Sequence, residues 1–420
     1  SDIFRFKFKV NLSEIDKASQ LPVKERFFAN SMIVDRVDVL TKEDFRIYSE
    51  SITSRSFLQS IQMGELLEKR GATVTYLALK HTETIQVAAL VYSLPMTGGL
   101  HMEINSGPIY SDATYLKEFY KDLQVYAKQH GALELIVKPY DTFQSFDTNG
   151  NPVTEEQQEI IQCLTNLGYC HDGLQIGYPG GEPDWLYVKD LEGITEENLI
   201  RSFSKKGKPL VKKARSFGIQ LRRLKRDELS IFKDITATTS KRREYSDKSL
   251  EYYEHFYDAF GDRAEFMVAT LNFQDYLSQL EKNQENLYKK IADFDAALRK
   301  SPDSAQKKKE HKELLHQFET FEVRKSEAHK LIAKYGEQKV VLAGSLFIYM
   351  PQESTYLFSG SYTEFNKFYA PALLQEYVML ESIKRGIPVY NFLGIQGIFD
   401  GSDGVLRFKQ NFNGYIVRKA

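Results

Sequence analysis

The sequence predicts a mixed α/β protein with a long helical hairpin inserted into its second half. Along most of the 420 residues, stretches in which apolar and polar residues alternate are followed by stretches with helical spacing. One stretch, residues 273–336, instead has a seven-residue repeat and dense charge. No apolar run approaches the roughly 18–20 residues of a membrane-spanning helix. At roughly 100–200 residues per domain, the chain is long enough for two or three domains.

Residues 1–36 are assigned to an N-terminal extension. Phe4, Phe6 and Phe8 alternate with basic residues, and this period of two is typical of an edge strand. A fresh strand-like stretch follows Met32, so the globular part is also compatible with a start near that residue. The alternation of charge and aromatic rings does not resemble a secretory signal.

Residues 37–184 are predicted to form the first α/β unit. Thr41 and Asp44 have the spacing of a helix cap, and glycines at 71, 131 and 168 mark the ends of further helices. The expected helices cover about 45–48, 56–70, 115–130 and 155–167, and the expected strands cover 73–79, 85–94 and 133–139.

The second unit is expected to comprise residues 185–272 and 337–420, separated by the hairpin of residues 273–336. Its later elements are strands at 339–349 and 355–358, a helix at 370–385 and a strand at 389–393. The heptad positions of the two arms are Leu277, Gln284, Ile291 and Leu298, then Leu314, Phe321, Ala328 and Tyr335. Two such arms joined by a proline turn predict an antiparallel coiled coil. At 1.5 Å per residue each arm is on the order of 35–40 Å long, so it projects from its host.

Charge is strongly segregated although the net charge is only −1. Between Arg201 and Arg226 the chain has eleven lysines and arginines and no acid. Such a segment in an otherwise balanced chain typically faces an anionic partner, and a solvated helix face is the alternative. The overall composition, 42% hydrophobic and 27% charged, is that of a globular protein and excludes wholesale disorder.

The basic segment predicts a phosphate-binding helix that runs from Pro209 to Gly218. Three lysines lie in the loop at its N-terminus, where the helix dipole and the backbone amides favour phosphate. The candidates for binding substrate are Lys205, Lys206, Lys208 and Lys212, and the candidates for contacts with tRNA are Lys213 and Arg215 farther along the helix. The turn of the hairpin is also basic, with Lys307, Lys308 and Lys309 as candidate contacts for tRNA, although a solvated tip is equally compatible with the pattern.

Motifs for metal, nucleophilic or cofactor chemistry are missing from the sequence. The two cysteines lack metal-ligand spacing, and there is no nucleophile elbow, phosphate-loop lysine motif or acyl-CoA pattern. The sequence therefore predicts no metal and no cofactor. The C-terminal third has three unusual stretches, at 357–371, 390–397 and 406–414, which are interpreted as strand ends whose loops converge on one sheet edge.

In combination, these stretches resemble the Fem/Mur family of aminoacyl-tRNA-dependent peptidoglycan interpeptide-bridge transferases, with the FemA and streptococcal alanine- or serine-adding types as the most similar members. The matching parts are FLQS (57–60), SGPIY (106–110), the lysine-rich helix, the hairpin, SGSYTEF (359–365), YNFLGIQG (390–397) and RFKQNF (407–412). The resemblance covers roughly residues 38–420. It implies two tandem acetyltransferase-like subdomains that form a cleft, with the hairpin inserted in the second.

The resemblance also implies the reaction and the partners. An amino acid, alanine in first place and serine in second, moves from the 3′ ester of a charged tRNA to the lysine amine of the stem peptide or to the growing bridge. The acceptor is lipid II or a related precursor. Because an ester is already activated, the amine attacks it directly and no protein nucleophile is needed. A cytoplasmic protein that meets the inner face of the plasma membrane through its substrate, and that is able to form a homodimer, is expected.

The resemblance implies several individual site residues. Lys409 matches the lysine of the family's RFK motif and is expected to contact substrate or the oxyanion. The acid after the Gly-Pro loop corresponds most closely to Asp112, and a first-helix lysine to Lys69. Tyr356 and Tyr362 are expected to line the cleft. Two other classes stay open: a non-catalytic module that binds tRNA or lipid precursor, and a CoA-dependent N-acyltransferase.

Overall fold

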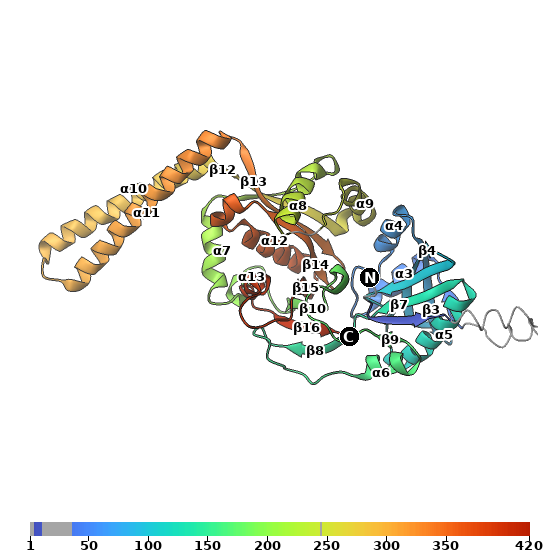
Figure 1. Cartoon of the computed structure of the whole chain (residues 1–420). Coiled ribbons are helices and arrows are strands. Elements are labelled where there is room, and N and C mark those ends of the chain that lie inside the picture. The colour runs from blue at the N-terminus through green and yellow to red at the C-terminus, as the bar shows by residue number, and fades with distance from the viewer. Residues whose placement is uncertain (1–3, 11–35, 244–245) are drawn as a thin grey trace, which may run out of the picture.

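The computed structural model describes residues 4–10, 36–243 and 246–420, and these form two mixed β-sheets from which a helical hairpin projects (Figure 1). The prediction of a mixed α/β protein with an inserted hairpin is confirmed. The suggested start of the globular part near Met32 lies outside the described residues. No described helix is both long and apolar enough to cross a membrane.

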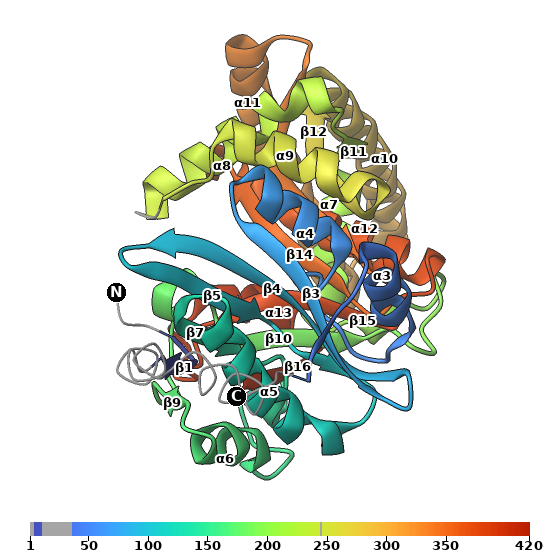
Figure 2. The same ribbon diagram turned by 90° about the vertical axis from the view of Figure 1, so that its right-hand side faces the viewer.

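The first sheet has the strand order β2-β3-β4-β5-β7-β1-β9, with β6 paired to β4. Its strands are β1 (Phe6–Lys9), β2 (Asp38–Val39), β3 (Thr73–His81), β4 (Thr84–Met96), β5 (Gly99–Asn105), β6 (Ile109–Tyr110), β7 (Ala132–Lys138) and β9 (Cys170–His171). The helices of this unit are α3 (Lys42–Ser51), α4 (Ile61–Lys69), α5 (Leu116–Gln129) and α6 (Glu159–Asn166). Figure 2 shows α5 against this sheet and α4 between the two units.

The second sheet has the order β11-β12-β13-β14-β15-β10-β16-β8. Its strands are β8 (Thr142–Phe146), β10 (Trp185–Asp190), β11 (Gln220–Arg223), β12 (Ala264–Asn272), β13 (Lys339–Tyr349), β14 (Ser354–Ser361), β15 (Val389–Ile395) and β16 (Tyr415–Lys419). The helices are α7 (Gly207–Ser216), α8 (Leu229–Arg243), α9 (Leu250–Phe260), α12 (Ala370–Lys384) and α13 (Gly404–Gln410), and the hairpin is formed by α10 (Phe273–Lys300) and α11 (Ala305–Tyr335).

Two strands lie where the sequence did not place them. β1 is a strand as predicted, but it lies between β7 and β9 rather than at an edge, because Phe6 is fully buried in the core of the first unit. β8 follows the first-unit strand β7 in the chain yet pairs with β16 in the second sheet. Phe143 and Phe146 are buried in that position. The chain therefore enters the second sheet once before residue 185.

Three helices begin at residues other than the predicted ones. α4 begins at Ile61 rather than at residue 56, since the Ser60 hydroxyl accepts a hydrogen bond from the Met63 amide. α6 begins four residues later than predicted, and α7 begins two residues earlier, at Gly207. The stretch at 406–414 is not a strand end: Asp403 caps a short helix there, α13.

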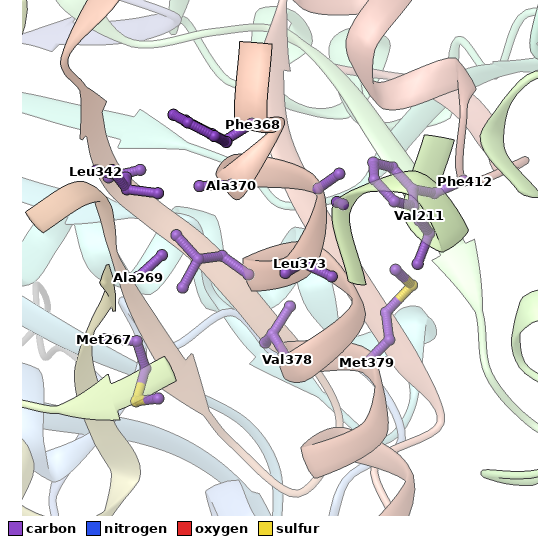
Figure 3. Packing of buried hydrophobic residues seen from close by; sticks show 14 of the residues in the cluster. Val211, Met267, Ala269, Leu342, Phe368, Ala370, Leu373, Val378, Met379 and Phe412 are labelled. Atoms are coloured by element: carbon purple, nitrogen blue, oxygen red, sulfur yellow. The ribbon is translucent and has the colours of Figure 1, made fainter. Parts of the chain in front are cut away.

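α12 holds the second unit together, because it packs between the sheet and α7. Figure 3 shows Leu373, Val378 and Met379 of this helix between strand residues such as Leu342 and the α7 residue Val211. All five side chains are buried, so the apolar area removed from water fixes α7 against the sheet.

The hairpin follows the heptad prediction. Leu280, Leu287 and Ile291 are buried along α10, and Leu287 and Ile291 pack with Leu314 of α11. Ser304 caps α11 directly after the predicted turn. Figure 1 shows both arms extending away from the body, so the tip is supported only by the coiled coil itself.

Candidate active site

Lys409 is not a surface lysine. It lies on α13, which Asp403 caps by accepting hydrogen bonds from the amides of Val405 and Leu406. The Lys409 side chain is only 6% exposed, and its Nζ donates to the carbonyl oxygen of Gly394 at 2.7 Å. Lysines are almost never buried without a partner. Helix α13 and the end of β15 therefore hold one ammonium group at a defined place.

Tyr356 is the predicted residue that the structure brings to Lys409. It lies half-buried on β14, and the Lys409 Nζ is 5.9 Å from the centre of its ring. Tyr362, six residues later, instead donates its hydroxyl to Asp234 of α8. Burial and the Asp234 carboxylate raise the pKa of Tyr362, so its phenol stays neutral. Of the two tyrosines predicted to line the cleft, Tyr356 is therefore a neighbour of Lys409, whereas Tyr362 is bound to α8.

The N-terminus of α7 lies against the C-terminal end of α13. The Ser204 amide donates to the Asn411 carbonyl at 3.0 Å, and a Cβ on Gly207 would lie 1.8 Å from the same oxygen. Only glycine permits this approach. We call this contact the α7–α13 junction. It places the first turn of the basic helix beside the helix that holds Lys409.

Four predicted phosphate ligands at α7 have no ion-pair partner within the described part of the chain. These lysines are Lys205, Lys206, Lys208 and Lys212. Because α7 begins at Gly207, Lys208 lies within its first turn and not in the preceding loop as predicted. The first-turn amides are already engaged, because the Gly207 amide donates to the Ser204 hydroxyl at 3.0 Å and the Lys208 amide donates to the Ser204 carbonyl at 3.1 Å. Phosphate binding here would therefore rest on the unpaired lysine side chains.

The remaining two candidates on α7 are already engaged. The Arg215 guanidinium faces both carboxylate oxygens of Glu376 on α12, with the Nε at 3.0 Å from Oε1. Lys213 lies over the ring of Tyr369 at 5.3 Å. A hollow of about 370 Å³ adjoins this end of α7, lined in part by Arg215, Phe217 and Gln279, and it does not include Lys409. Arg215 therefore ties α7 to α12.

Asp112 and Lys69 are not brought to Lys409 by any contact in the described ranges. Asp112 is exposed and caps a short turn by accepting from the Thr114 amide at 3.0 Å and hydroxyl at 2.8 Å. These bonds lower the pKa of Asp112, which makes it a poor proton acceptor. Lys69 is 3.9 Å from Asp258 of α9, so it joins α4 to the second unit.

The motifs FLQS and SGPIY form one structure. Gln59 is fully buried, accepts from the Leu90 amide at 2.7 Å and donates to the Asn105 carbonyl at 2.8 Å. A Cβ on Gly107 would lie 2.7 Å from the Gln59 side chain, so glycine is required there. Gln59 thereby fixes the end of β5 and the start of the Gly107-Pro108 turn.

Sequence reasoning missed a polar cluster between the two sheets. The Tyr140 hydroxyl donates to Glu353 at 2.6 Å, the Asn391 amide donates to the same carboxylate at 3.1 Å, and the Lys419 Nζ donates to the Tyr140 carbonyl at 2.9 Å. Burial raises the pKa of Glu353 and lowers that of Lys419 to about 8. The four residues come from distant segments with no shared motif, so no local signal marks them. The cluster joins the loop after β7 to the second sheet.

The three lysines of the hairpin tip lie on the first turn of α11. Lys308 and Lys309 are exposed, whereas Lys307 is half-buried. In the part of the chain that the structure describes, none of them forms an ion pair, and Figure 1 shows the tip well away from α13.

Comparison with known proteins identifies related chains. The family model described as "FemAB family" matches residues 40–420. Aminoacyltransferase FemA from Staphylococcus aureus strain bovine RF122 / ET3-1 and from strain N315 is in each case 26% identical over 387 residues, which cover 90% of this chain and 92% of the relative. The crystal structure of FemX has a TM-score of 0.70 at 20% identity, covering 91% of this chain and 95% of that chain. This likeness confirms the predicted tandem acetyltransferase-like fold.

Proposed function

Because the chain belongs to the FemAB family, we propose that it moves an amino acid from charged tRNA to the stem-peptide lysine amine, or to the growing cross-bridge, of a lipid-linked peptidoglycan precursor. The chain is an aminoacyltransferase of this family. We propose alanine as the transferred residue, with serine as the second candidate. The observation that supports the proposal best is the buried ammonium of Lys409, held at the end of β15 by α13, the helix whose C-terminal end contacts the start of the basic helix α7.

The proposed reaction needs positioning and charge stabilisation more than a protein nucleophile. The neutral acceptor amine attacks the ester carbonyl carbon, a C–N bond forms, and the C–O bond to the tRNA ribose breaks. One proton leaves the amine and one joins the 3′ oxygen of the tRNA. Negative charge develops on the carbonyl oxygen meanwhile, and a fixed ammonium group stabilises it. Lys409 is the described side chain best suited to this task.

We assign the phosphate contacts to the α7 lysines. Lys205, Lys206 and Lys208 lie at the junction with α13, so a phosphate held there lies beside the helix that holds Lys409. Lys212 extends the same charge along the helix. Arg215 is assigned a structural role because Glu376 already neutralises it. Both the tRNA and the lipid-linked acceptor have phosphate groups that these lysines are able to bind. Of the two, we assign the tRNA to α7.

A transfer assay tests the proposal. The protein is incubated with radiolabelled Ala-tRNA and lysine-containing lipid II, with Ser-tRNA and Gly-tRNA in parallel reactions. A precursor that already has one bridge residue serves as a second acceptor. We expect label on the precursor from Ala-tRNA. Equal binding of charged and uncharged tRNA without any transfer would instead favour the non-catalytic module, and acetyl-CoA turnover would favour the CoA-dependent class.

A further inference from the structure

A glycine-rich segment, residues 172–184, crosses from the first unit to the second and lies against the strand end that holds Lys409. We call it the connecting segment. The Gly177 amide donates to the Gln396 carbonyl at 2.7 Å, which attaches the middle of the segment to the loop after β15. Gly177 has a φ of 78°, so its backbone adopts the left-handed conformation that glycine tolerates best.

The second-unit contact of the segment is with Gly394. A Cβ at this position would lie 2.6 Å from the Tyr178 ring and 2.7 Å from Pro183, so the segment packs directly on the glycine backbone. The carbonyl oxygen of Gly394 is the acceptor for the Lys409 Nζ at 2.7 Å. Tyr178 and Pro183 therefore restrict the backbone position that fixes the ammonium group.

One first-unit contact of the segment is made by Glu182, and another is made by Arg5, which pairs with Asp184 at 2.8 Å and donates to the Pro183 carbonyl at 3.3 Å. The Glu182 carboxylate is 3.1 Å from the Lys138 Nζ on β7 and accepts from the Asn105 amide group at 3.4 Å. The carbonyl of Asn105 is in turn held by Gln59, the glutamine of FLQS. A continuous set of contacts thus runs from Gln59 through Asn105 and Glu182 to the segment that packs on Gly394.

We propose that Tyr178 and Glu182 are positioning residues for the transfer reaction, and that the connecting segment sets the location of the Lys409 ammonium relative to the first unit. The inference rests on the proposed function, because it assigns a purpose to the position of Lys409. A displacement of about 1 Å at a reacting centre costs on the order of 10²-fold in rate. The contacts of Gly177, Tyr178 and Pro183 with the second unit and of Glu182 with the first unit hold the segment against such a displacement.

Double-variant kinetics separate positioning from a general structural role. Tyr178→Ala and Glu182→Gln are each expected to lower kcat about tenfold, with the KM for charged tRNA within twofold. Tyr178→Phe keeps the ring and is expected to restore most of the rate. In a Lys409→Met background, Tyr178→Ala is expected to cause no further loss, because the residue acts through Lys409. Ile176→Ala, in the same segment but 57% exposed, is the matched control and leaves kcat unchanged.

A second measurement does not depend on turnover. Acylation of lysines by a water-soluble active ester, followed by mass spectrometry, measures how accessible Lys409 is. We expect Lys409 to be modified slowly in the wild type and at least severalfold faster in Tyr178→Ala, with Ile176→Ala unchanged. An unchanged modification rate, or kinetic losses that add fully to that of Lys409→Met, overturns the inference. If the wild-type protein shows no transfer, the proposed function is contradicted. The acylation rates still test whether Tyr178 positions Lys409, because they do not depend on turnover.

Discussion

Both the hairpin tip and the start of α7 at the α7–α13 junction have a cluster of lysines, but the surroundings of the two clusters differ. At the tip, Lys308 and Lys309 are exposed on an arm that extends away from the body (Figure 1). At the junction, Gly207 packs on the Asn411 carbonyl, and the buried Lys409 lies two residues before Asn411, on α13. Lys205 and Lys206 are exposed like Lys308 and Lys309, so charge density and exposure do not distinguish the two regions. What distinguishes them is that the backbone at the start of α7 contacts the end of the helix that holds the buried Lys409.

The largest effect is expected from breaking the junction itself. Gly207→Ala introduces a Cβ 1.8 Å from a backbone oxygen, which side-chain movement cannot relieve. We expect a loss of unfolding free energy of about 1–3 kcal/mol and a fall in transfer rate of about tenfold or more. Thermal unfolding and the transfer assay measure both. Gly404→Ala is the control, because its Cβ would meet only the flexible end of Arg407 at 3.3 Å.

Removing the junction cations is expected to weaken binding and leave the chemistry intact. A variant in which Lys205, Lys206 and Lys208 are all alanine should raise the KM for charged tRNA about tenfold, with kcat within twofold. The slope of the logarithm of the binding constant against the logarithm of the salt concentration should become shallower by roughly two to three. Tight binding at an unchanged salt slope would show that the phosphates bind elsewhere.

The same change at the hairpin tip is expected to have a smaller effect. With Lys307, Lys308 and Lys309 replaced by alanine, the KM for charged tRNA should rise about threefold at most, because exposed cations on a projecting arm contribute mainly long-range attraction. Binding titrations of both triple variants at one ionic strength compare the two regions directly. A larger effect at the tip would reverse the comparison.

A second buried lysine, Lys189, is expected to affect the stability of the protein but not the transfer rate. Lys189 is 4% exposed and donates to the Asn413 carbonyl at 3.0 Å, and burial lowers its pKa to about 8. The unfolded-state value is about 10.4, so the unfolded chain binds more protons between these two pH values, and unfolding free energy rises with pH there. Lys189→Met should be more stable than wild type by on the order of 3 kcal/mol at pH 7, with the difference vanishing near pH 10.5. Urea unfolding at several pH values measures this difference, and a constant gap would contradict it.

Periodicity and caps were sufficient to predict the mixed α/β class and the inserted hairpin, whereas the tandem subdomains were implied by the family resemblance. The heptads of the hairpin, the cap at Thr41 and the strands around the hairpin follow from spacing alone, because local packing determines them. The pairing of strands that lie far apart in the sequence cannot be predicted from such local patterns. Nothing in Thr142–Phe146 indicates that β8 joins the second sheet. The helix at Gly404–Gln410 was missed, and the stretch at 406–414 interpreted as a strand end, because seven residues are too few for a helical period to show.

The candidate site was predictable only in part. Lys409 and the α7 lysines follow from motif and charge, and the structure adds that they share one junction. That Arg215 is paired with Glu376, and that Asp112 caps a turn, depends on partners that no spacing encodes. The contact of Tyr178 with Gly394 likewise appears only in three dimensions.

The central claim is that Lys409 acts in the transition state and not in binding or folding. Its most direct test is the single-turnover rate of transfer with enzyme in excess, for Lys409→Met and, as matched control, Lys189→Met. We expect Lys409→Met to lower the rate constant about 10²-fold while the Kd for charged tRNA stays within twofold, and Lys189→Met to react at the wild-type rate. A Lys409→Met variant that transfers at the wild-type rate would contradict the claim.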